Sequence, residues 1–438
     1  MPDAVRRATA DEAWLAAMLD FEAALATAEA RAGLVPEEAA RAIGAACRAE
    51  HFDLGELGRA ARAAGNPVPA LVRALTAAVG GEAAQNVHRG ATSQDVLDTA
   101  AMLVARRTLE LIDAELAGAA AASARLADAH RATPMVGRTL LQQAVPITFG
   151  VKVAGWLVGV GEARERLASI ALPVQLGGAA GTLASLGADG VRVLGLLAEE
   201  LELAEPVLPW HTTRAPVAQL GAALALAAGA LEKVALDVVL MAQTEVGEVA
   251  EAPRDGRGGS STLPQKRNPI GSVVAIGCAR GVRGAASVLL GAMAQEHERA
   301  AGAWHAEWEA LREALQLTGG TAAAMAEVLD GLEVQPERMR ENLDAAGGLV
   351  LAEAVSTALA DKLGRGEAHQ RVEAASRRAL DTGSPLRDVL LDTPGVSDHL
   401  SAREIDRALD PAGYLGSADE FVTRVLNRYR AREDGGPA

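Results

Sequence analysis

The sequence predicts an all-α protein built around a bundle of long helices, and two observations lead to this prediction. Apolar residues make up 50% of the 438 residues but aromatic residues only 3%, so the core has to be built from Ala, Leu and Val. Small aliphatic side chains of this kind favour closely packed helices. In addition, apolar residues recur at helical spacing over five or six long stretches, as expected for helices packed in a bundle.

The expected helices can be placed in chain order. Residues 11–33 carry an apolar stripe that ends at Gly33, and the proline and acidic pair at residues 36–38 start a second helix that runs to about residue 49. Longer stretches follow at about 93–131, 146–170, 188–203, 214–247, 268–296 and 305–330. The stretch 214–247 is apolar nearly all round, so we expect it to be a central helix enclosed by its neighbours.

The same pattern predicts three domains. We expect a small helical N-terminal domain over residues 1–92, a domain of long bundled helices over 93–344, and a smaller helical domain over 345–438, where glycine and proline become frequent. β signals are scattered, as in Pro173–Leu176, and no internal repeat is visible.

Composition argues against several classes of protein. The net charge is −15 and no long Lys/Arg block is present, so nucleic-acid binding is not expected. Cys47 and Cys278 are far apart in apolar helical contexts, which fits buried thiols in a reducing cytoplasm. The N-terminus lacks the apolar core of a signal peptide. The most apolar stretch, 217–246, is interrupted by three charged residues, so we interpret it as a buried helix rather than a membrane span.

No metal site or cofactor is expected. His297 and His305 are eight residues apart with a glycine between them, and neither cysteine has a neighbouring metal ligand. The run Gly177–Gly181 lacks the strand and helix that flank a dinucleotide-binding glycine motif.

Thr92 and Ser93 precede an apolar helix and are natural N-caps, with Asp95 placed to serve its first turn. Capping does not explain His88 and Arg89, which would add positive charge beside a helix N-terminus that already suits anions. Anion binding and simple capping therefore both remain open for this segment.

Two further segments are polar where a loop leads into a long helix. The first contains Arg138, Thr139, Gln142 and Gln143, which are either solvated and bonded to the turn, or recognise carboxylate and amide groups. The second contains His211 and Arg214; a surface histidine is the ordinary alternative here, but the preceding Pro-Trp indicates a packed loop with a defined role.

The most informative segment is the loop 258–269, GGSSTLPQKRNP. Its glycines allow several backbone N–H groups to approach one anion, and its two prolines restrain the loop. The spacing fits neither a phosphate-binding GxxxxGK[ST] loop nor a G-x-S-x-G nucleophile elbow. A flexible linker is the alternative, but linkers rarely carry so mixed a set of hydrogen-bond donors.

Residues 259–269 closely resemble the GSSxMPxKxNP signature of the fumarase/aspartase superfamily. Residues 92–95 and 137–139 match its other two signature regions in the expected order, so the resemblance covers nearly the whole chain. It implies a three-domain helical subunit, a homotetramer around long central helices, and active sites assembled from three subunits that act on small di- or tricarboxylates. Within the superfamily, residues 90–99, 177–184, 209–212, 297–299 and 304–308 are most similar to bacterial 3-carboxy-cis,cis-muconate cycloisomerases.

The resemblance also implies a role for each loop residue. Ser260 would transfer the proton next to a carboxylate, and Ser261 would bind beside it. Lys266 and Asn268 would hold the aci-carboxylate, where donors aimed at developing charge supply much of the catalysis.

One departure is that superfamily members often carry a histidine in the second region, where this chain has Leu140 and Gln143. His88 or His211 would replace that histidine, or water would act instead. A C–N lyase of the same superfamily, releasing fumarate from an adenylosuccinate-like or nitrosuccinate substrate, is the main alternative; a noncatalytic helical scaffold is the other.

Overall fold

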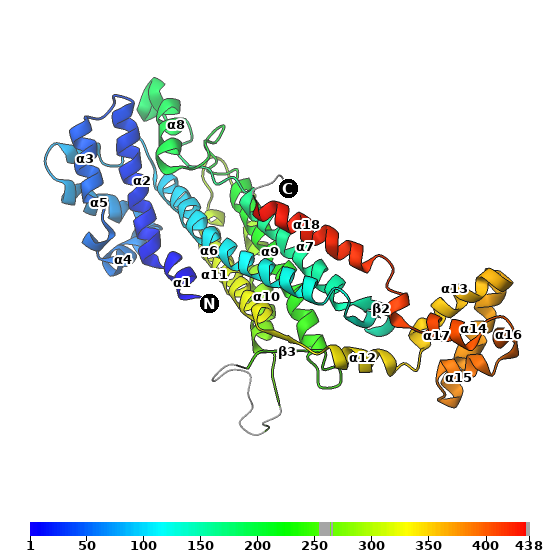
Figure 1. Cartoon of the computed structure of the whole chain (residues 1–438). Coiled ribbons are helices and arrows are strands. Elements are labelled where there is room, and N and C mark those ends of the chain that lie inside the picture. The colour runs from blue at the N-terminus through cyan, green and yellow to red at the C-terminus, as the bar shows by residue number, and fades with distance from the viewer. Residues whose placement is uncertain (254–262, 264–265, 435–438) are drawn as a thin grey trace. The chain divides into compact units, whose positions relative to one another are not determined.

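The structure is a computed structural model that describes residues 1–253, 263 and 266–434 (Figure 1). By backbone contacts the chain divides into two compact units, each built from three separate segments. Unit 1 consists of Met1–Ala117, Glu162–Glu232 and Val274–Ala324, and unit 2 of Gly118–Gly161, Lys233–Val273 and Met325–Ala438. The long helices are continuous elements that contribute residues to both units.

Unit 1 holds the N-terminal helices and the larger part of four long ones, α6, α9, α10 and α11. Helix α2 packs against α3 and α8, and a small core of Ala26, Ala40 and Ile43 lies among these short helices. Besides the end of α7, the helices that contribute to unit 1 are α1 (Asp3–Ala8), α2 (Asp11–Arg31), α3 (Glu37–Ala46), α4 (Leu54–Ala64), α5 (Val68–Val79), α6 (Ser93–Ala129), α8 (Gly190–Leu201), α9 (Ala215–Met241), α10 (Ile270–Gly291) and α11 (Ala303–Asp330).

Within unit 1 the long helices approach closely at small residues. A Cβ added to Gly221 of α9 would lie 2.6 Å from the Leu289 side chain of α10, and one added to Gly281 of α10 would lie 2.5 Å from Leu317 of α11. This close approach is what the scarcity of aromatic residues led us to expect. The prediction of an all-α fold is confirmed.

Unit 2 combines two short antiparallel strand pairs with helices. Strand β1 (Pro134–Thr139) pairs with β2 (Gln142–Thr148), and β3 (Val249–Glu251) pairs with β4 (Leu332–Val334). The C-terminal helices share a separate core that includes Val355, Leu359 and Val372, and Figure 1 draws them as a group in orange. The remaining helices of unit 2 are α7 (Phe149–Ala168, shared with unit 1), α12 (Pro336–Asp344), α13 (Ala352–Leu363), α14 (Arg365–Thr382), α15 (Leu386–Leu391), α16 (Pro394–Ser397), α17 (Ala402–Ala408) and α18 (Ala418–Glu433).

The predicted long helices match α6 to α11 within a few residues, except that α9 ends at Met241 rather than at 247 and α10 ends at Gly291 rather than at 296. The expectation that α9 is enclosed by its neighbours is wrong for a single chain. Leu226 is 54% exposed, and Leu236 and Leu240 are each about 40% exposed. An apolar stripe left open in one subunit is typical of a helix that is covered by another protein surface.

Helix α10 is long and apolar enough, by length and composition alone, to cross a membrane. Its two arginines, Arg280 and Arg283, however, both pair with Glu232 of α9. Such lateral ion pairs are typical of a helix packed in a bundle.

Candidate active site

In unit 1 the carboxylate of Asp95 joins three segments of chain. It accepts hydrogen bonds from the backbone N–H groups of Thr92 (2.9 Å), Gly177 (2.9 Å) and Gly178 (3.0 Å). The Nε2–H of His211 donates to the same carboxylate at 2.6 Å. Asp95 therefore both serves the start of α6, as predicted, and fixes His211, which is only 4% exposed.

Arg214 is buried and lies three residues after His211, directly before α9 begins. Its guanidinium donates two hydrogen bonds to Asp98 (2.7 and 2.9 Å) and contacts both oxygens of Glu307 at 2.5–3.1 Å. Burial by itself lowers the pKa of Arg214, but the two carboxylates outweigh burial and raise it. The Trp304 indole donates to Asp98 at 2.9 Å, so the carboxylate is satisfied from two helices.

His88 is paired with a buried carboxylate on α2. Its Nδ1 lies 2.7 Å from Oε1 of Glu22, whose side chain is fully buried, whereas the His88 side chain is 17% exposed. Burial lowers the pKa of His88, but the hydrogen bond and charge of Glu22, with the charge of Asp95, raise it above its ordinary value. The backbone of His88 is left-handed, with φ 57°, a conformation that costs a non-glycine residue energy.

Two arginines of unit 1 are held by neutral acceptors instead of carboxylates. Arg89 donates to the Leu34 carbonyl at 3.1 Å and is exposed. Arg299 donates to Oε1 of Gln94 at 2.9 Å and to the carbonyls of Gly178 and Ala179. No carboxylate hydrogen-bonds to them in the described part of the chain, although the charge of Arg89 also acts on the buried Glu29 carboxyl.

In unit 2 the predicted segment 138–143 forms a β-hairpin, not a simple turn before a helix. This hairpin could not be predicted, because the two residues of its tight turn, Leu140 and Leu141, both have positive φ (51° and 65°), where glycine or asparagine is usual. Both leucines are exposed, by 96% and 75%. Thr139, Gln142 and Gln143 are exposed at the same tip.

Arg138 lies at the base of this tip and is already engaged by the protein. Its guanidinium makes a bidentate pair with Glu248, with distances of 2.7 and 2.8 Å, and the Glu248 side chain is fully buried. Asn342 of α12 donates to the same carboxylate at 3.0 Å. Gln143 donates weakly to the Asn342 carbonyl at 3.4 Å, so the hairpin is joined to α12.

Lys152, in the first turn of α7, is a cation that the sequence reading missed. Burial lowers the pKa of Lys152. The charges of Lys233 and Arg138 lower it further, and those of Asp237 and Glu248 oppose this effect without reversing it. Among the described residues no hydrogen bond or ion pair reaches its ammonium. Its position on the helix that directly follows β2 could have drawn attention to it.

The serine loop is described only in part. Ser260 and Ser261, the predicted proton-transfer and binding residues, lie outside the described residues. Lys266 is exposed and Asn268 is partly buried, two residues before α10 begins. The start of α10 is capped by Glu251, whose carboxylate accepts from the backbone N–H groups of Gly271 (2.9 Å) and Ser272 (2.8 Å).

The predicted residues that the structure describes are divided between the two compact units. Unit 1 contains His88, Arg89, Thr92, Ser93, His211 and Arg214. Unit 2 contains Arg138, Thr139, Gln142, Gln143, Lys266 and Asn268. The sequence reading missed the carboxylates that orient these groups, because nothing in the local pattern connects residues so distant in the chain. Within the described ranges, no group of three potential metal ligands occurs.

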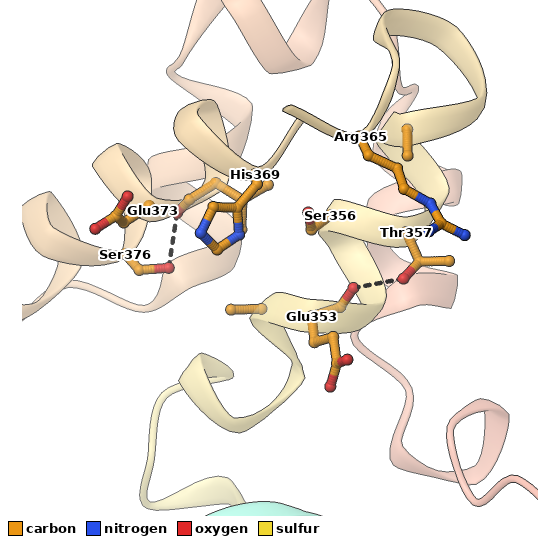
Figure 2. A pocket seen from close by; sticks show the side chains of 10 residues that line it. Glu353, Ser356, Thr357, Arg365, His369, Glu373 and Ser376 are labelled. Atoms are coloured by element: carbon orange, nitrogen blue, oxygen red, sulfur yellow. Dashed lines mark hydrogen bonds between the residues drawn. The ribbon is translucent and has the colours of Figure 1, made fainter. Parts of the chain in front are cut away.

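A separate pocket lies in the C-terminal part of unit 2, between α13 and α14 (Figure 2). It has a volume of about 730 Å³ and is lined by Glu353, Arg365, His369 and Glu373, among others. The Thr357 and Ser376 hydroxyls, labelled in Figure 2, donate to carbonyls of their own helices at 2.9 and 2.8 Å. None of the predicted site residues lines this pocket.

The first prediction concerns Arg214. Replacing Arg214 with Leu removes the cation that separates Asp98 from Glu307, and leaves two buried carboxylates unpaired. Breaking such a buried pair costs about 3–5 kcal/mol, whereas an exposed pair contributes about 0–1 kcal/mol. Urea denaturation should therefore show a large decrease in the free energy of unfolding for Arg214→Leu. The decrease should be close to zero for Arg340→Leu, which removes an exposed pair with Asp344. Equal losses would mean that the buried network is not stabilising.

The second prediction is a pH dependence set by Glu29. This residue is fully buried, both its carboxylate oxygens lack a hydrogen-bond partner, and burial raises its pKa from 4.5 to about 8, against the opposing charge of Arg89. The folded state binds the proton of the Glu29 carboxyl more tightly than the unfolded state does. Protonation of Glu29 therefore stabilises the fold fully below pH 4.5. This stabilisation is lost as the pH rises towards 8, by up to about 1.4 kcal/mol per pH unit.

Glu29→Gln removes this titration. Denaturant unfolding should show that the free energy of unfolding of the variant increases relative to that of the unmodified protein as the pH rises from 6 to 8.5. A constant difference between the two across this range would show that Glu29 does not titrate as its burial implies.

Comparisons with known proteins agree with the motif. The sequence matches the family model described as lyase over residues 2–284 and the model described as adenylosuccinate lyase C-terminus over residues 348–425. A nitrosuccinate lyase from Streptomyces davaonensis is 51% identical over 435 residues, covering 96% of this chain and 92% of that protein. A 3-carboxy-cis,cis-muconate cycloisomerase from Pseudomonas aeruginosa is 48% identical over 433 residues, covering 98% and 94%.

Among solved structures, the 3-carboxy-cis,cis-muconate lactonizing enzyme from Pseudomonas putida matches with a TM-score of 0.92 at 47% identity, covering 98% of this chain and 97% of that one. Family models that cover most of the sequence and relatives of near-equal length lead to the same assignment. The chain belongs to the lyase family of the fumarase/aspartase superfamily and is an enzyme of that superfamily.

Proposed function

We propose that this enzyme is a 3-carboxy-cis,cis-muconate cycloisomerase of the lactonising type, which would serve the protocatechuate branch of aromatic degradation. The observation that carries the proposal is similarity over nearly the full chain to several cycloisomerases, at 46–48% identity, together with an intact serine-loop motif. No cofactor is needed for this reaction, because only a proton and a carboxylate move.

In the proposed reaction a carboxylate oxygen of the muconate forms a bond to a carbon of the diene. The π electrons of that double bond move onto the adjacent carbon and its carboxylate, and a proton is then delivered to that carbon to give 4-carboxymuconolactone. Ser260 is the proposed proton-transfer group, and Lys266 and Asn268 are the proposed donors to the charged intermediate. A positioned proton-transfer group and one such donor are each worth roughly a hundredfold or more.

The charges of the described residues support a tricarboxylate as the substrate. Among the described residues, Arg89 and Arg299 are hydrogen-bonded only by neutral acceptors, and Arg299 contacts Gln94 in the first turn of α6. Positive charge held in this way attracts anions even in a protein whose net charge is −15. Thr92 and Ser93, partly buried at that helix start, are proposed substrate-binding residues.

Elimination of nitrite from nitrosuccinate is a second candidate, favoured by the 51% identity with a nitrosuccinate lyase. Both reactions pass through a carbanion stabilised by an adjacent carboxylate, so the same serine loop would serve either. They differ in the bond at the β carbon, which is C–O in the cycloisomerase and C–N in the lyase.

We further propose that the enzyme is a cytoplasmic homotetramer with active sites shared between subunits. The exposed apolar side chains of Leu226, Val274 and Val288 in unit 1 support burial against other copies of the chain. The exposed leucine pair at the tip of the β1–β2 hairpin supports a further contact of the same kind.

The third prediction decides between the two candidates. Purified enzyme should cause the ultraviolet absorbance of 3-carboxy-cis,cis-muconate to fall, because ring closure removes the conjugated diene. Nitrosuccinate and a succinyl amine, tested beside it, should release no fumarate. Fumarate release without loss of muconate absorbance would reject the cycloisomerase and establish the lyase, and turnover of none of these substrates would reject both candidates.

The fourth prediction concerns the serine loop. Ser260→Ala should lower kcat by about a hundredfold or more, because it removes the proton-transfer group, while the assembly measured by size-exclusion chromatography stays unchanged. Ser261→Ala is the matched control and should mainly raise KM. Near-normal turnover by Ser260→Ala would remove this serine from the mechanism.

A further inference from the structure

Two histidines of unit 1 were candidates for the acidic group that the second signature region lacks, and their surroundings differ. His211 is 4% exposed, and its Nε2 is bound to Asp95, which also holds three backbone N–H groups. His211 is therefore part of the internal support of the loop. His88 is bound through Nδ1 only, and the described structure gives its Nε2 no hydrogen-bond partner.

The pairing of His88 fixes which nitrogen faces outward. Glu22 is a buried carboxylate and can only accept, so the Nδ1 of His88 must donate to it. Its Nε2 is then left for a ligand, on a side chain that is partly exposed, next to Arg89 and the start of α6. A carboxylate that binds one ring nitrogen commonly orients a functional histidine, whose other ring nitrogen then faces the ligand.

The cost of this arrangement indicates that it serves a purpose beyond packing. His88 adopts a left-handed backbone conformation, and Oε2 of Glu22 is buried without a partner. Strain and unsatisfied carboxylates persist where surrounding structure maintains them, and they cluster at functional sites. The charged groups that act on His88 are Glu22 on α2 and Asp95 on α6, Arg89 follows it in the chain, and Glu29 on α2 is coupled to Arg89 and Glu22.

We infer that Glu22 is a positioning residue that holds His88 as an imidazolium, so that its Nε2–H binds a substrate carboxylate together with Arg89. The inference rests on the proposed function in that it requires an anionic substrate, but it applies to the muconate and the nitrosuccinate reactions alike. It assigns roles that differ for the two histidines: His88 contacts substrate and His211 supports the loop.

The fifth prediction is a shift in the pH profile of Glu22→Gln. Without the carboxylate, burial lowers the pKa of His88, so the imidazolium is lost at lower pH. The decrease of kcat/KM on the alkaline side should occur at a pH about one unit or more lower, mainly through a rise in KM. His88→Gln should abolish that alkaline decrease, and the double variant should behave like His88→Gln alone.

Glu29→Gln is the matched control, since it removes a buried carboxylate on the same helix that makes no hydrogen bond to His88, and it should leave the alkaline decrease in place. An unchanged alkaline decrease in Glu22→Gln, or effects of the two single variants that simply add, would overturn the inference. If Glu22→Gln does not fold, an unaltered profile of His88→Gln would overturn it equally.

A second readout separates this inference from the proposed function. The His88 ring can be titrated by NMR in histidine-labelled enzyme, with its signal assigned by its loss in His88→Gln. The pKa should fall in Glu22→Gln whether or not any substrate is turned over, and an unchanged pKa would reject the pairing. Failure of every substrate with a shifted NMR pKa would reject the proposed function alone.

Discussion

The buried ion cluster of Arg214 with Asp98 and Glu307 is the constraint on which unit 1 depends. Three charges removed from water are tolerated only when each is satisfied by others, because desolvation costs several kcal/mol per ion. The cluster meets this condition with donors from Trp304, Gln94, Gln175 and Gln295. Since the three charged residues come from α6, α11 and the start of α9, their geometry fixes the register of these helices.

That fixed register also supports the predicted site. Asp98 lies one turn after Asp95 on α6, so placing Asp98 against Arg214 places Asp95 where it accepts from Gly177, Gly178 and His211. A Cβ on Gly177 would lie 2.8 Å from the His211 ring, so glycine is required there for close packing. The glycine run that failed as a dinucleotide motif has this structural purpose instead.

Features governed by nearby residues could be predicted from the sequence. The long helices follow from apolar periodicity, and the role of Asp95 at the start of α6 follows from its spacing to Thr92. The hairpin could not be predicted, because Leu140 and Leu141 occupy a turn that leucine rarely adopts. The pairs Glu22–His88 and Arg138–Glu248 could not be predicted either, since they join residues 66 and 110 positions apart. The motif resemblance proposed several cations for the site, but it could not predict which groups hold them.

These pairings divide the predicted cationic groups by electrostatic role. Arg138, Arg214 and His211 already have buried carboxylate partners, so a substrate anion would have to compete with fixed negative charge for them. Arg89 and Arg299 have neutral partners, and burial lowers the pKa of the partly buried Lys152 ammonium. An acidic protein can therefore bind a polyanion if its paired cations shape the site and its unpaired cations attract the ligand. Within unit 1 this leaves Arg89 and Arg299 as guanidinium groups for which an anion would not have to compete with a hydrogen-bonded carboxylate among the described residues.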